Sequence, residues 1–346
     1  MVHALPQMPN ENASARFCLS IAVPIYNEES TLPELLQRTR AVLDQIPGGP
    51  HQLLFVDDGS SDRTMQVLEQ AVQADPRIFV ISLSRNFGHQ AALSAALDCA
   101  VGDAVVLMDG DLQDAPEAIP IFVEHYRNGY DVVYATRATR REGWPVQLSY
   151  LLFYRLQAML SDTPLPLDAG DFGLMSRRVV DQIRRMPEHH RYLRGLRSWV
   201  GFRQVAVPLD RLERHSGRSK YGFFKLLKLA SDGIFAFSVV PLRAATLIGT
   251  FAVMASTLYA LYSAYAKFAL HRAPQGFTAL VFLVSFLSGV LLFFLGIIGE
   301  YVGRVYEEIK GRPLYVVAQT VGSSSPGRTD RQRSDEVPAS PRESHQ

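Results

Sequence analysis

Short apolar runs alternate with amphipathic stretches between residues 18 and 136. The runs are rich in Val, Ile and Leu and do not alternate strictly with polar residues, as expected for strands that are covered on both faces. They lie at 18–23, 52–56, 78–83, 103–108 and 131–135. The amphipathic stretches are typical of helices and lie at 31–46, 62–74, 88–100 and 116–127. This spacing predicts an α/β fold with a doubly wound, mostly parallel sheet.

Two runs without a charged residue follow later in the chain, at 244–266 and 276–299. Each is longer than the roughly 20 residues that a helix needs to cross a bilayer. Because only a short connection joins them, we expect a transmembrane hairpin rather than two helices of a soluble core. The region 222–243 before the hairpin combines Phe and Leu with Lys225 and Lys228, which predicts amphipathic interface helices at a membrane surface.

Basic residues flank the predicted hairpin more densely than they occupy its connecting loop. The flanks carry Lys220, Lys225, Lys228, Arg243, Arg304, Lys310 and Arg312. The loop carries Lys267 and Arg272. By the positive-inside rule, this predicts an integral protein of a bacterial-type inner membrane, with the large domain and both termini in the cytoplasm. A GxxxG pair, Gly299 and Gly303, leaves a homo-oligomer open, although the pattern is common by chance.

These patterns divide the chain into six parts. They are a flexible leader at 1–17, a folded domain at 18–221, the interfacial region at 222–243, the hairpin at 244–303, a cytoplasmic segment at 304–321 and a tail at 322–346. The leader lacks the apolar region of a secretory signal. The tail has no aromatic residue and is rich in Ser, Pro, Arg and Asp, so we expect it to be disordered.

Composition and missing motifs exclude several classes of protein. The 35 Lys and Arg residues nearly balance the 34 Asp and Glu residues, which argues against a nucleic-acid binder. Two cysteines are too few for a disulfide framework, and they form no CxxC motif. The sequence has no G-x-G-x-x-G fingerprint, no P-loop, no HExxH and no GxSxG. A dehydrogenase, a P-loop ATPase, a zinc protease and an α/β-hydrolase are therefore disfavoured.

Polar clusters follow four of the predicted strands, where open α/β sheets bind their ligands. They lie at 24–29, 57–62, 84–89 and 109–114. A helix cap or a tight turn explains any one of these clusters, but it does not predict four of them on one edge.

Asp109 and Asp111 are the most informative pair, because they flank a glycine at the end of an apolar strand. Two adjacent carboxylates repel each other unless a cation or a proton intervenes. Oxygen ligands select Mg²⁺ or Mn²⁺, and Mg²⁺ is commonly held by one or two carboxylates together with substrate phosphates. Gln113 adds a neutral oxygen nearby. The motif therefore predicts a metal site at Asp109, Asp111 and Gln113 that holds a diphosphate.

Five motifs at these strand ends resemble the inverting glycosyltransferases of family 2, which have the GT-A fold. They are PIYNEE (24–29), VDDGSSDRT (56–64), SRNFGHQAA (84–92), DGDLQDAPE (109–117) and GYDVVYATR (129–137). Three later segments, at 167–180, 191–202 and 214–221, resemble the polyprenyl-phosphate glycosyltransferases, which include bactoprenol glucosyltransferases and dolichol-phosphate mannose synthases. The resemblance extends over residues 18 to 318.

The resemblance implies a role for individual residues. A nucleotide-sugar pocket would be formed by Pro24, Tyr26, Asn27, Glu28, Asp57, Asp58, Arg85, Gly88, Asp109, Gly110 and Asp111. Asp57 would face the base, and Asp171 would be the catalytic carboxylate. Phosphates of the donor or the acceptor would contact Arg137, Arg214, Ser219 and Lys220. Gly173 stands where relatives often carry Arg, which leaves the identity of the sugar open.

The implied reaction is the inverting transfer of a sugar from a nucleotide-diphosphate donor, expected to be UDP-glucose, to a membrane polyprenyl phosphate. Alternatives are the same reaction with GlcNAc, mannose or an aminoarabinose-type sugar, or an inactive nucleotide-sugar-binding subunit. A lipid-sugar flippase is a poorer fit, because two spans without charges offer no polar path. A processive synthase would need a QxxRW motif and further spans, which the sequence lacks.

Overall fold

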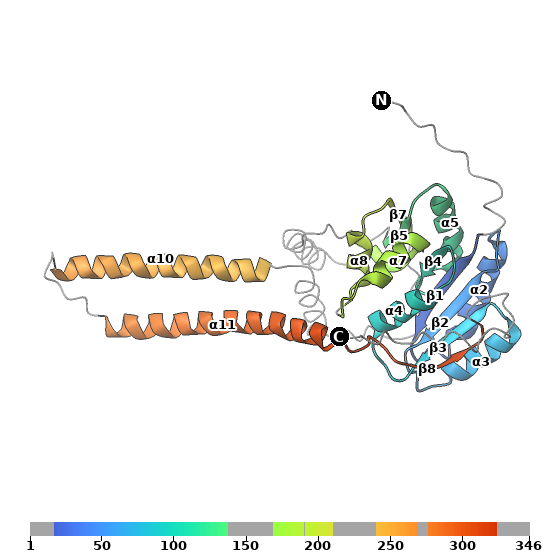
Figure 1. Ribbon diagram of the computed structural model, residues 1–346, viewed down its shortest axis with the longest axis horizontal. Coiled ribbons are helices and arrows are strands. Elements are labelled where there is room, and N and C mark those ends of the chain that lie inside the picture. Colours follow the sequence, from blue (N-terminus) through green and yellow to red (C-terminus); the bar gives the residue numbers. More distant parts are fainter. Residues whose placement is uncertain (1–16, 138–168, 190, 210–239, 269–275, 324–346) are drawn as a thin grey trace, which may run out of the picture.

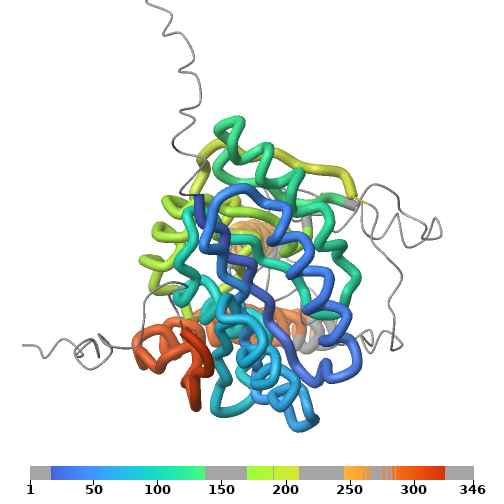
Figure 2. The backbone as a smooth tube through the Cα atoms, turned by 90° about the vertical axis from the view of Figure 1, so that its right-hand side faces the viewer, coloured from blue at the N-terminus to red at the C-terminus, as the bar shows by residue number. Residues whose placement is uncertain are grey.

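A computed structural model describes most of the chain, and the described ranges are 17–137, 169–189, 191–209, 240–268 and 276–323. An α/β domain is built on one sheet of eight strands. Two long helices extend from this domain, α10 (Val240–Phe268) and α11 (Phe277–Lys310) (Figure 1). Seen from the domain end, the two helices lie behind the domain (Figure 2). The expected leader up to residue 16, the interfacial region up to residue 239 and the tail from residue 324 lie outside the described residues.

The centre of the sheet consists of four parallel strands in the order β4-β1-β2-β3. Their bounds are β1 (Leu19–Ile25), β2 (Gln52–Asp57), β3 (Ile78–Leu83) and β4 (Ala104–Leu107). Every residue of these four strands is buried, as the continuous apolar runs predict. The sequence-based prediction of an α/β fold with a parallel core is confirmed.

Helices cover both faces of the sheet and create two separate apolar layers. One layer is formed with α2 (Leu32–Gln45), α3 (Thr64–Ala74), the 3₁₀ turn η1 (Pro116–Ala118) and α5 (Ile119–Arg127). The other is formed with α4 (His89–Cys99), α7 (Arg177–Arg185) and α8 (Leu193–Trp199). Successive residues of β2 point to opposite layers, so Phe55 packs in the first layer and Leu54 in the second.

Four further strands extend this core and make the sheet mixed, in the full order β7-β5-β6-β4-β1-β2-β3-β8. Their bounds are β5 (Val132–Arg137), β6 (Ala169–Ser176), β7 (Gln204–Leu209) and β8 (Val317–Val321). Strand β6 lies antiparallel between β4 and β5, and β7 runs parallel to β5. The sequence analysis predicted β5 but not β6, β7 or β8, which lie outside the run of alternating strands and helices at 18–136.

Strand β8 brings the C-terminal segment back to the domain after α11. It pairs antiparallel with β3, and the Ser84 backbone N–H donates to the Val316 carbonyl oxygen at 2.8 Å. The Tyr315 hydroxyl donates to Asp98 on α4 at 2.8 Å. The segment 304–321, expected to be cytoplasmic, contains the end of α11 and the edge strand β8, and its location stays a prediction. The pairing of β8 and the Tyr315 hydrogen bond therefore attach the chain that follows α11 to the domain.

Helices α10 and α11 run side by side away from the domain and expose many large apolar side chains (Figure 1). Among the described residues, one helical segment, Phe286–Lys310, is long and apolar enough to cross a membrane. The apolar segment Ala245–Tyr259 of α10 is shorter than that. The two-helix transmembrane hairpin therefore stays a prediction.

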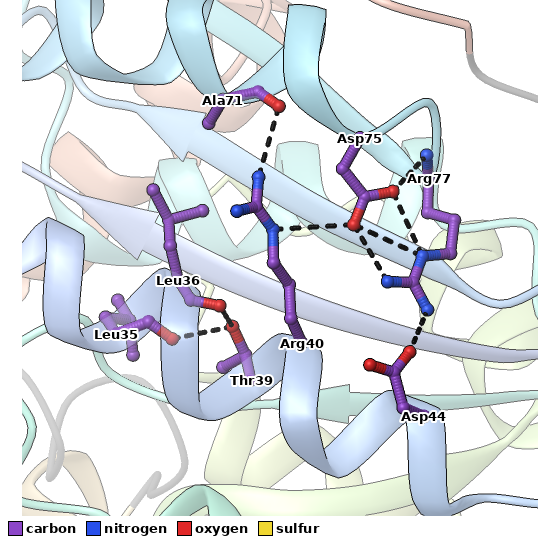
Figure 3. Close-up of polar contacts among 8 residues, drawn as sticks. All are labelled: Leu35, Leu36, Thr39, Arg40, Asp44, Ala71, Asp75 and Arg77. Atoms are coloured by element: carbon purple, nitrogen blue, oxygen red, sulfur yellow. Dashed lines mark hydrogen bonds and ion pairs between the residues drawn. The ribbon is translucent and has the colours of Figure 1, made fainter.

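A network of charged side chains joins α2 to the end of α3 on the surface of the domain (Figure 3). Arg77 donates to Asp75 at 2.8 Å and to Asp44 of α2 at 2.6 Å. Arg40 of α2 lies 3.4 Å from Asp75 and also donates to the Ala71 carbonyl oxygen at the end of α3. The hydrogen bonds from Arg77 hold the pKa of Asp75 below its usual value, against the opposing effect of burial.

Candidate functional site

The carboxyl ends of β1 and β2 lie together, because the two strands are parallel neighbours. Asn27 follows β1 and adopts a left-handed conformation, which Asn tolerates better than most residues. Its backbone N–H donates to the Ser60 hydroxyl at 2.9 Å, and its side-chain oxygen accepts from the Ser61 N–H at 2.8 Å. The Glu28 N–H donates to Thr64 at 2.9 Å. The PIYNEE and VDDGSSDRT motifs thus form one cross-braced surface, on which Tyr26 is exposed.

Asp57 and Asp58 are both buried at the end of β2 and hold the neighbouring loops. Asp57 accepts from the Ser60 N–H at 3.1 Å and from the Ser82 hydroxyl at 3.0 Å. Asp58 accepts from the Phe87 and Gly88 N–H groups at 2.8 and 3.0 Å. Burial raises the pKa of Asp58, although these two N–H donors oppose the shift. Each carboxylate oxygen has a second lone pair, so both residues retain the capacity to accept a ligand.

Two glycines permit close approach between these loops. A Cβ atom on Gly59 would lie 2.6 Å from the backbone carbon of Arg85, and Gly59 also has a left-handed φ of +70°. A Cβ atom on Gly110 would lie 2.7 Å from the Ile25 side chain at the end of β1. Larger residues at either position would separate loops that otherwise pack in contact.

Strand β6 brings a distant carboxylate to the same edge of the sheet. Because β6 pairs with β4, Asp171 comes close to the Asp109-Gly110-Asp111 motif that follows β4. His89, at the start of α4, lies between them. Its Nε2 atom is 3.5 Å from Asp109 Oδ1 and 3.6 Å from Asp171 Oδ2. Burial alone would lower the pKa of His89, but the two carboxylates outweigh it and raise that pKa.

Asp171 is held by a two-point ion pair with Arg194 of α8. The guanidinium Nε and Nη2 atoms donate to Asp171 Oδ1 and Oδ2, each at 2.7 Å. The Asp171 side chain is 6% exposed, so burial by itself would raise its pKa. Arg194 and His89 reverse this effect and place the pKa of Asp171 well below its usual value. The geometry therefore stabilises Asp171 as an anion.

A second arginine of α8, Arg197, lies near the ion pair of Asp171 and Arg194. Its Nη1 atom donates to the Gly170 carbonyl oxygen at 3.2 Å, and its guanidinium stacks 4.8 Å from the centre of the Tyr134 ring. Burial lowers the pKa of Arg197 to about 10, so it stays charged at neutral pH. Two guanidinium groups thus accompany the Asp171 carboxylate.

The loop after β4 carries the candidate metal ligands. Asp111 Oδ1 accepts from the Gln113 backbone N–H at 3.1 Å. Between them, Leu112 has a φ of +58°, an uncommon conformation for leucine that is frequent at functional loops. Within the described residues, no three His, Cys, Asp or Glu side chains are arranged to hold a metal ion. Two carboxylates nevertheless fit a cation that completes its coordination with substrate phosphates.

The structure places the other predicted residues as follows. Pro24 is buried in β1, Glu28 accepts from the Thr31 hydroxyl at 2.5 Å, and Arg137 ends β5. Gly173 lies where β5 passes so close that a Cβ atom would be 2.5 Å from the Val133 carbonyl oxygen. The predicted phosphate ligands Arg214, Ser219 and Lys220 lie outside the described residues.

The family model described as glycosyl transferase family 2 matches residues 20–184. An uncharacterised glycosyltransferase of Bacillus subtilis (strain 168), YkcC, is 44% identical over 88% of this chain and 94% of its own length. The chain belongs to glycosyl transferase family 2.

Further relatives of this glycosyltransferase carry more specific names. The SfII prophage-derived bactoprenol glucosyl transferase of Shigella flexneri is 37% identical over 87% of this chain and 98% of its own length. Among solved structures, the mannosyltransferase PcManGT from Pyrobaculum calidifontis, in complex with GDP-Man and Mn²⁺, is 17% identical. That match has a TM-score of 0.43 and covers 82% of this chain and 88% of the other.

Three residues of this glycosyltransferase site received no role in the sequence analysis, namely His89, Arg194 and Arg197. All three belong to motifs that carry the family resemblance, SRNFGHQAA and RYLRGLRSWVGF. Arg194 and Arg197 are three residues apart, which places them on one side of a helix. That spacing was visible in the sequence, but the contact with Asp171 depends on the pairing of β6 with β4.

Proposed function

We propose that this glycosyltransferase transfers a sugar from a nucleotide-diphosphate donor, UDP-glucose, to a polyprenyl phosphate in the membrane, with inversion at the anomeric carbon. The observation that carries the proposal is the meeting of the Asp109-Gly110-Asp111 loop with Asp171, His89 and Arg194 at one sheet edge. The relatives named bactoprenol glucosyl transferase support the lipid acceptor and the glucosyl group. The mixed α/β sheet supports the GT-A fold that the motifs imply.

The reaction is a single displacement. An oxygen of the acceptor phosphate attacks the anomeric carbon while the bond from that carbon to the donor's β-phosphate oxygen breaks. The nucleoside diphosphate leaves with the electron pair, and the acceptor becomes a phosphodiester. Because the second pKa of a phosphate monoester is about 6, the acceptor is mostly a dianion at pH 7 and has little need of a base.

Asp171 would therefore act by charge and position. A carboxylate held at both oxygens by Arg194 has low proton affinity, which makes it a weak general base. The same fixed negative charge suits the positive charge that develops on the sugar ring, because preorganised groups stabilise such charge without reorganisation. Arg194 and His89 would keep that carboxylate ionised and oriented.

Asp109 and Asp111, with Gln113, would hold Mg²⁺ or Mn²⁺. A bound metal ion would neutralise negative charge on the departing diphosphate. The cross-braced loops after β1 and β2 would surround the nucleotide sugar with Tyr26, Asn27, Glu28 and Asp57. The other residues predicted to bind the nucleotide sugar would complete this site. Arg137, Arg214, Ser219 and Lys220 would contact phosphate groups. Asp57, whose oxygens each accept one hydrogen bond within the protein, would offer a remaining lone pair to a base N–H.

The membrane part of the proposal is a two-helix hairpin formed by α10 and α11, with the catalytic domain and both termini on the cytoplasmic side of an inner membrane. The apolar segment Phe286–Lys310 supports the second span. An integral hairpin would hold the sheet edge near a lipid acceptor that does not leave the bilayer. The GxxxG pair Gly299 and Gly303 offers a packing face for a second copy.

A transfer assay tests the proposal. The full chain in lipid nanodiscs would receive undecaprenyl phosphate, Mg²⁺ or Mn²⁺ and, one at a time, radiolabelled UDP- and GDP-sugars. We expect label from UDP-glucose to enter the lipid fraction. Asp111→Ala should abolish this transfer, whereas Asp181→Ala, which removes a half-buried carboxylate of α7, should not.

The alternatives give different results in the same assay. Transfer of GlcNAc, mannose or an aminoarabinose-type sugar instead of glucose would correct the donor and keep the reaction. Nucleotide binding without transfer of any sugar would identify an inactive nucleotide-sugar-binding subunit and overturn the proposal.

A further inference from the structure

A cavity of about 430 Å³ lies where the catalytic domain meets the chain that follows α11. Its walls come from the β3–α4 loop, the first turns of α4, the loop before α8 and the segment after α11. Three arginines, Arg85, Arg191 and Arg312, line it together with His189, and no carboxylate is among the residues that line it. The cavity is therefore strongly basic, although the whole chain is nearly neutral.

Arg191, one of the residues that line the cavity, has donor atoms without a hydrogen-bond partner in the described part of the chain. Its Nη2 atom donates to the Met186 carbonyl oxygen at 2.7 Å. Its Nε and Nη1 atoms are buried and have no hydrogen-bond partner within the described part of the chain. Charged donors that are withdrawn from water without a partner are costly, so such groups normally bind an anion or an acceptor.

The residues that line the cavity include no acid. The Arg85 guanidinium lies 4.1 Å from the centre of the Phe87 ring and donates to the Asn86 carbonyl oxygen. Two acids on neighbouring elements lie outside this lining. Glu308 of α11 accepts from the His189 N–H, and Asp98 of α4 accepts from the Tyr315 hydroxyl.

The position of the cavity links it both to the long apolar helix and to the catalytic site. Arg312 follows Gly311, whose left-handed conformation ends α11. On the other side, the cavity residue Gln90 is adjacent in sequence to His89 and accepts from the Leu193 N–H at 3.0 Å. An anion bound here would touch segments that also carry the Asp171 site.

We propose that this cavity is a binding site for a phosphate monoester, recognised by Arg191 and Arg312. This inference rests on the proposed function and deepens it, because the phosphate would be that of the lipid acceptor as it arrives along α11. A planar guanidinium matches the oxygens of a phosphate group with two parallel hydrogen bonds. A free phosphate has the same chemistry, and the experiment distinguishes the two sources.

Binding would be measured by titration calorimetry on the full chain in detergent, without a sugar donor. The probes are farnesyl phosphate, farnesol as its uncharged counterpart, and inorganic phosphate. We expect Arg191→Gln and Arg312→Gln each to weaken farnesyl phosphate binding about tenfold, as expected for the loss of a charge-assisted contact. The matched variant Arg127→Gln removes an exposed arginine of α5 and should bind like the wild type.

The probes identify the source of the phosphate. Tighter binding of farnesyl phosphate than of inorganic phosphate, with no binding of farnesol, supports a lipid headgroup. Equal binding of both phosphates, with the same loss in both variants, supports a site for free phosphate. Wild-type affinity for both phosphates in Arg191→Gln and Arg312→Gln would overturn the proposal.

Two further measurements separate this inference from misfolding and from the proposed function. Arg191→Lys keeps the charge but loses the fork, so it should recover part of the affinity in a chain whose thermal unfolding matches that of Arg191→Gln. If no sugar is transferred while the arginine variants still lose phosphate binding, the proposed function fails and the site stands. If transfer occurs with an unchanged KM for the lipid in both variants, the site fails alone.

Discussion

The two sides of the candidate site are built in different ways. On the side of β1, β2 and β3, neighbouring βα loops hold one another mainly through uncharged donors, as where Asp58 accepts two backbone N–H groups. On the side of β6 and α8, Asp171 depends on two ionisable side chains, Arg194 and His89. The first arrangement fixes the shape of the loops, whereas the second fixes a charge.

This difference matters for the chemistry. A donor nucleotide needs a surface that already has its shape, and short loops braced by hydrogen bonds supply it at little cost in entropy. A developing positive charge needs a fixed negative group, and an ion pair keeps that group ionised. The loop with Asp109 and Asp111 lies between the two sides, next to His89.

On the charged side of the site, Asp171→Asn should have the largest effect, because it removes the fixed charge and keeps the shape of the side chain. We expect the rate of sugar transfer to fall about 100- to 1000-fold, the range seen when one preorganised electrostatic group is lost. The rate would be measured from pH 6 to pH 9 beside Asp181→Asn as the matched control. If Asp171 acts by charge, the loss stays constant with pH.

A general base predicts another profile for the same variant. Its loss should shrink as pH rises and the acceptor phosphate ionises fully. Such a profile would contradict the electrostatic role that the Arg194 pair indicates.

Arg194→Gln tests the other half of the ion pair. The buried Asp171 carboxylate would lose its two-point partner and be left with His89. We expect unfolding to become easier by about 1–3 kcal/mol, less than for a fully buried pair because the Arg194 side chain is 38% exposed. Chemical denaturation measures this, and transfer should fall with it. Arg194→Lys should recover only part of either loss, because an ammonium cannot donate in the same fork.

The two sides also differed in how far the sequence predicted them. The loops after β1 to β4 were found because each follows an apolar run directly, and parallel strands bring such ends together. The Asp171 site was harder, because β6 contains glycines and a buried Asp and pairs with a strand more than 60 residues away. Asp171 itself was named from family resemblance alone. Strand β8 was missed because it joins the sheet only after two long helices.

Gly59→Ala tests whether close packing holds the loops after β1, β2 and β3 together. Gly59 and Gly201 have nearly the same left-handed φ, +70° and +71°, but a Cβ atom meets the Arg85 backbone at Gly59 and nothing within 4 Å at Gly201. Gly201→Ala therefore measures the cost of the backbone conformation alone. We expect Gly59→Ala to destabilise the domain by about 1–3 kcal/mol more than Gly201→Ala, which is the range for overpacking. Chemical denaturation gives the difference.

The same pair of variants tests whether the loops after β1, β2 and β3 bind the nucleotide. Gly59→Ala should weaken UDP binding by moving the β2–α3 loop away from Arg85, while Gly201→Ala should leave it unchanged. Equal effects of the two substitutions on both measurements would show that the loops are not in close contact.

Asp75→Asn should have the smallest effect and should leave the site untouched. Asp75 joins α2 and α3 through Arg77 and Arg40 (Figure 3). It lies just before β3, at the edge of the parallel strands opposite to the loops of the site. Its pKa is lowered in the folded chain, so the carboxylate stabilises the fold above its ordinary pKa of about 4, and this contribution is lost as pH falls through the lower, folded-state pKa. We expect the variant to be about 1 kcal/mol less stable than the wild type at pH 7, with this gap closing towards pH 2. Sugar transfer at pH 7 should not change. A gap in unfolding free energy that persists at pH 2 would mean that Asp75 contributes through its shape and neutral hydrogen bonds, not through its charge.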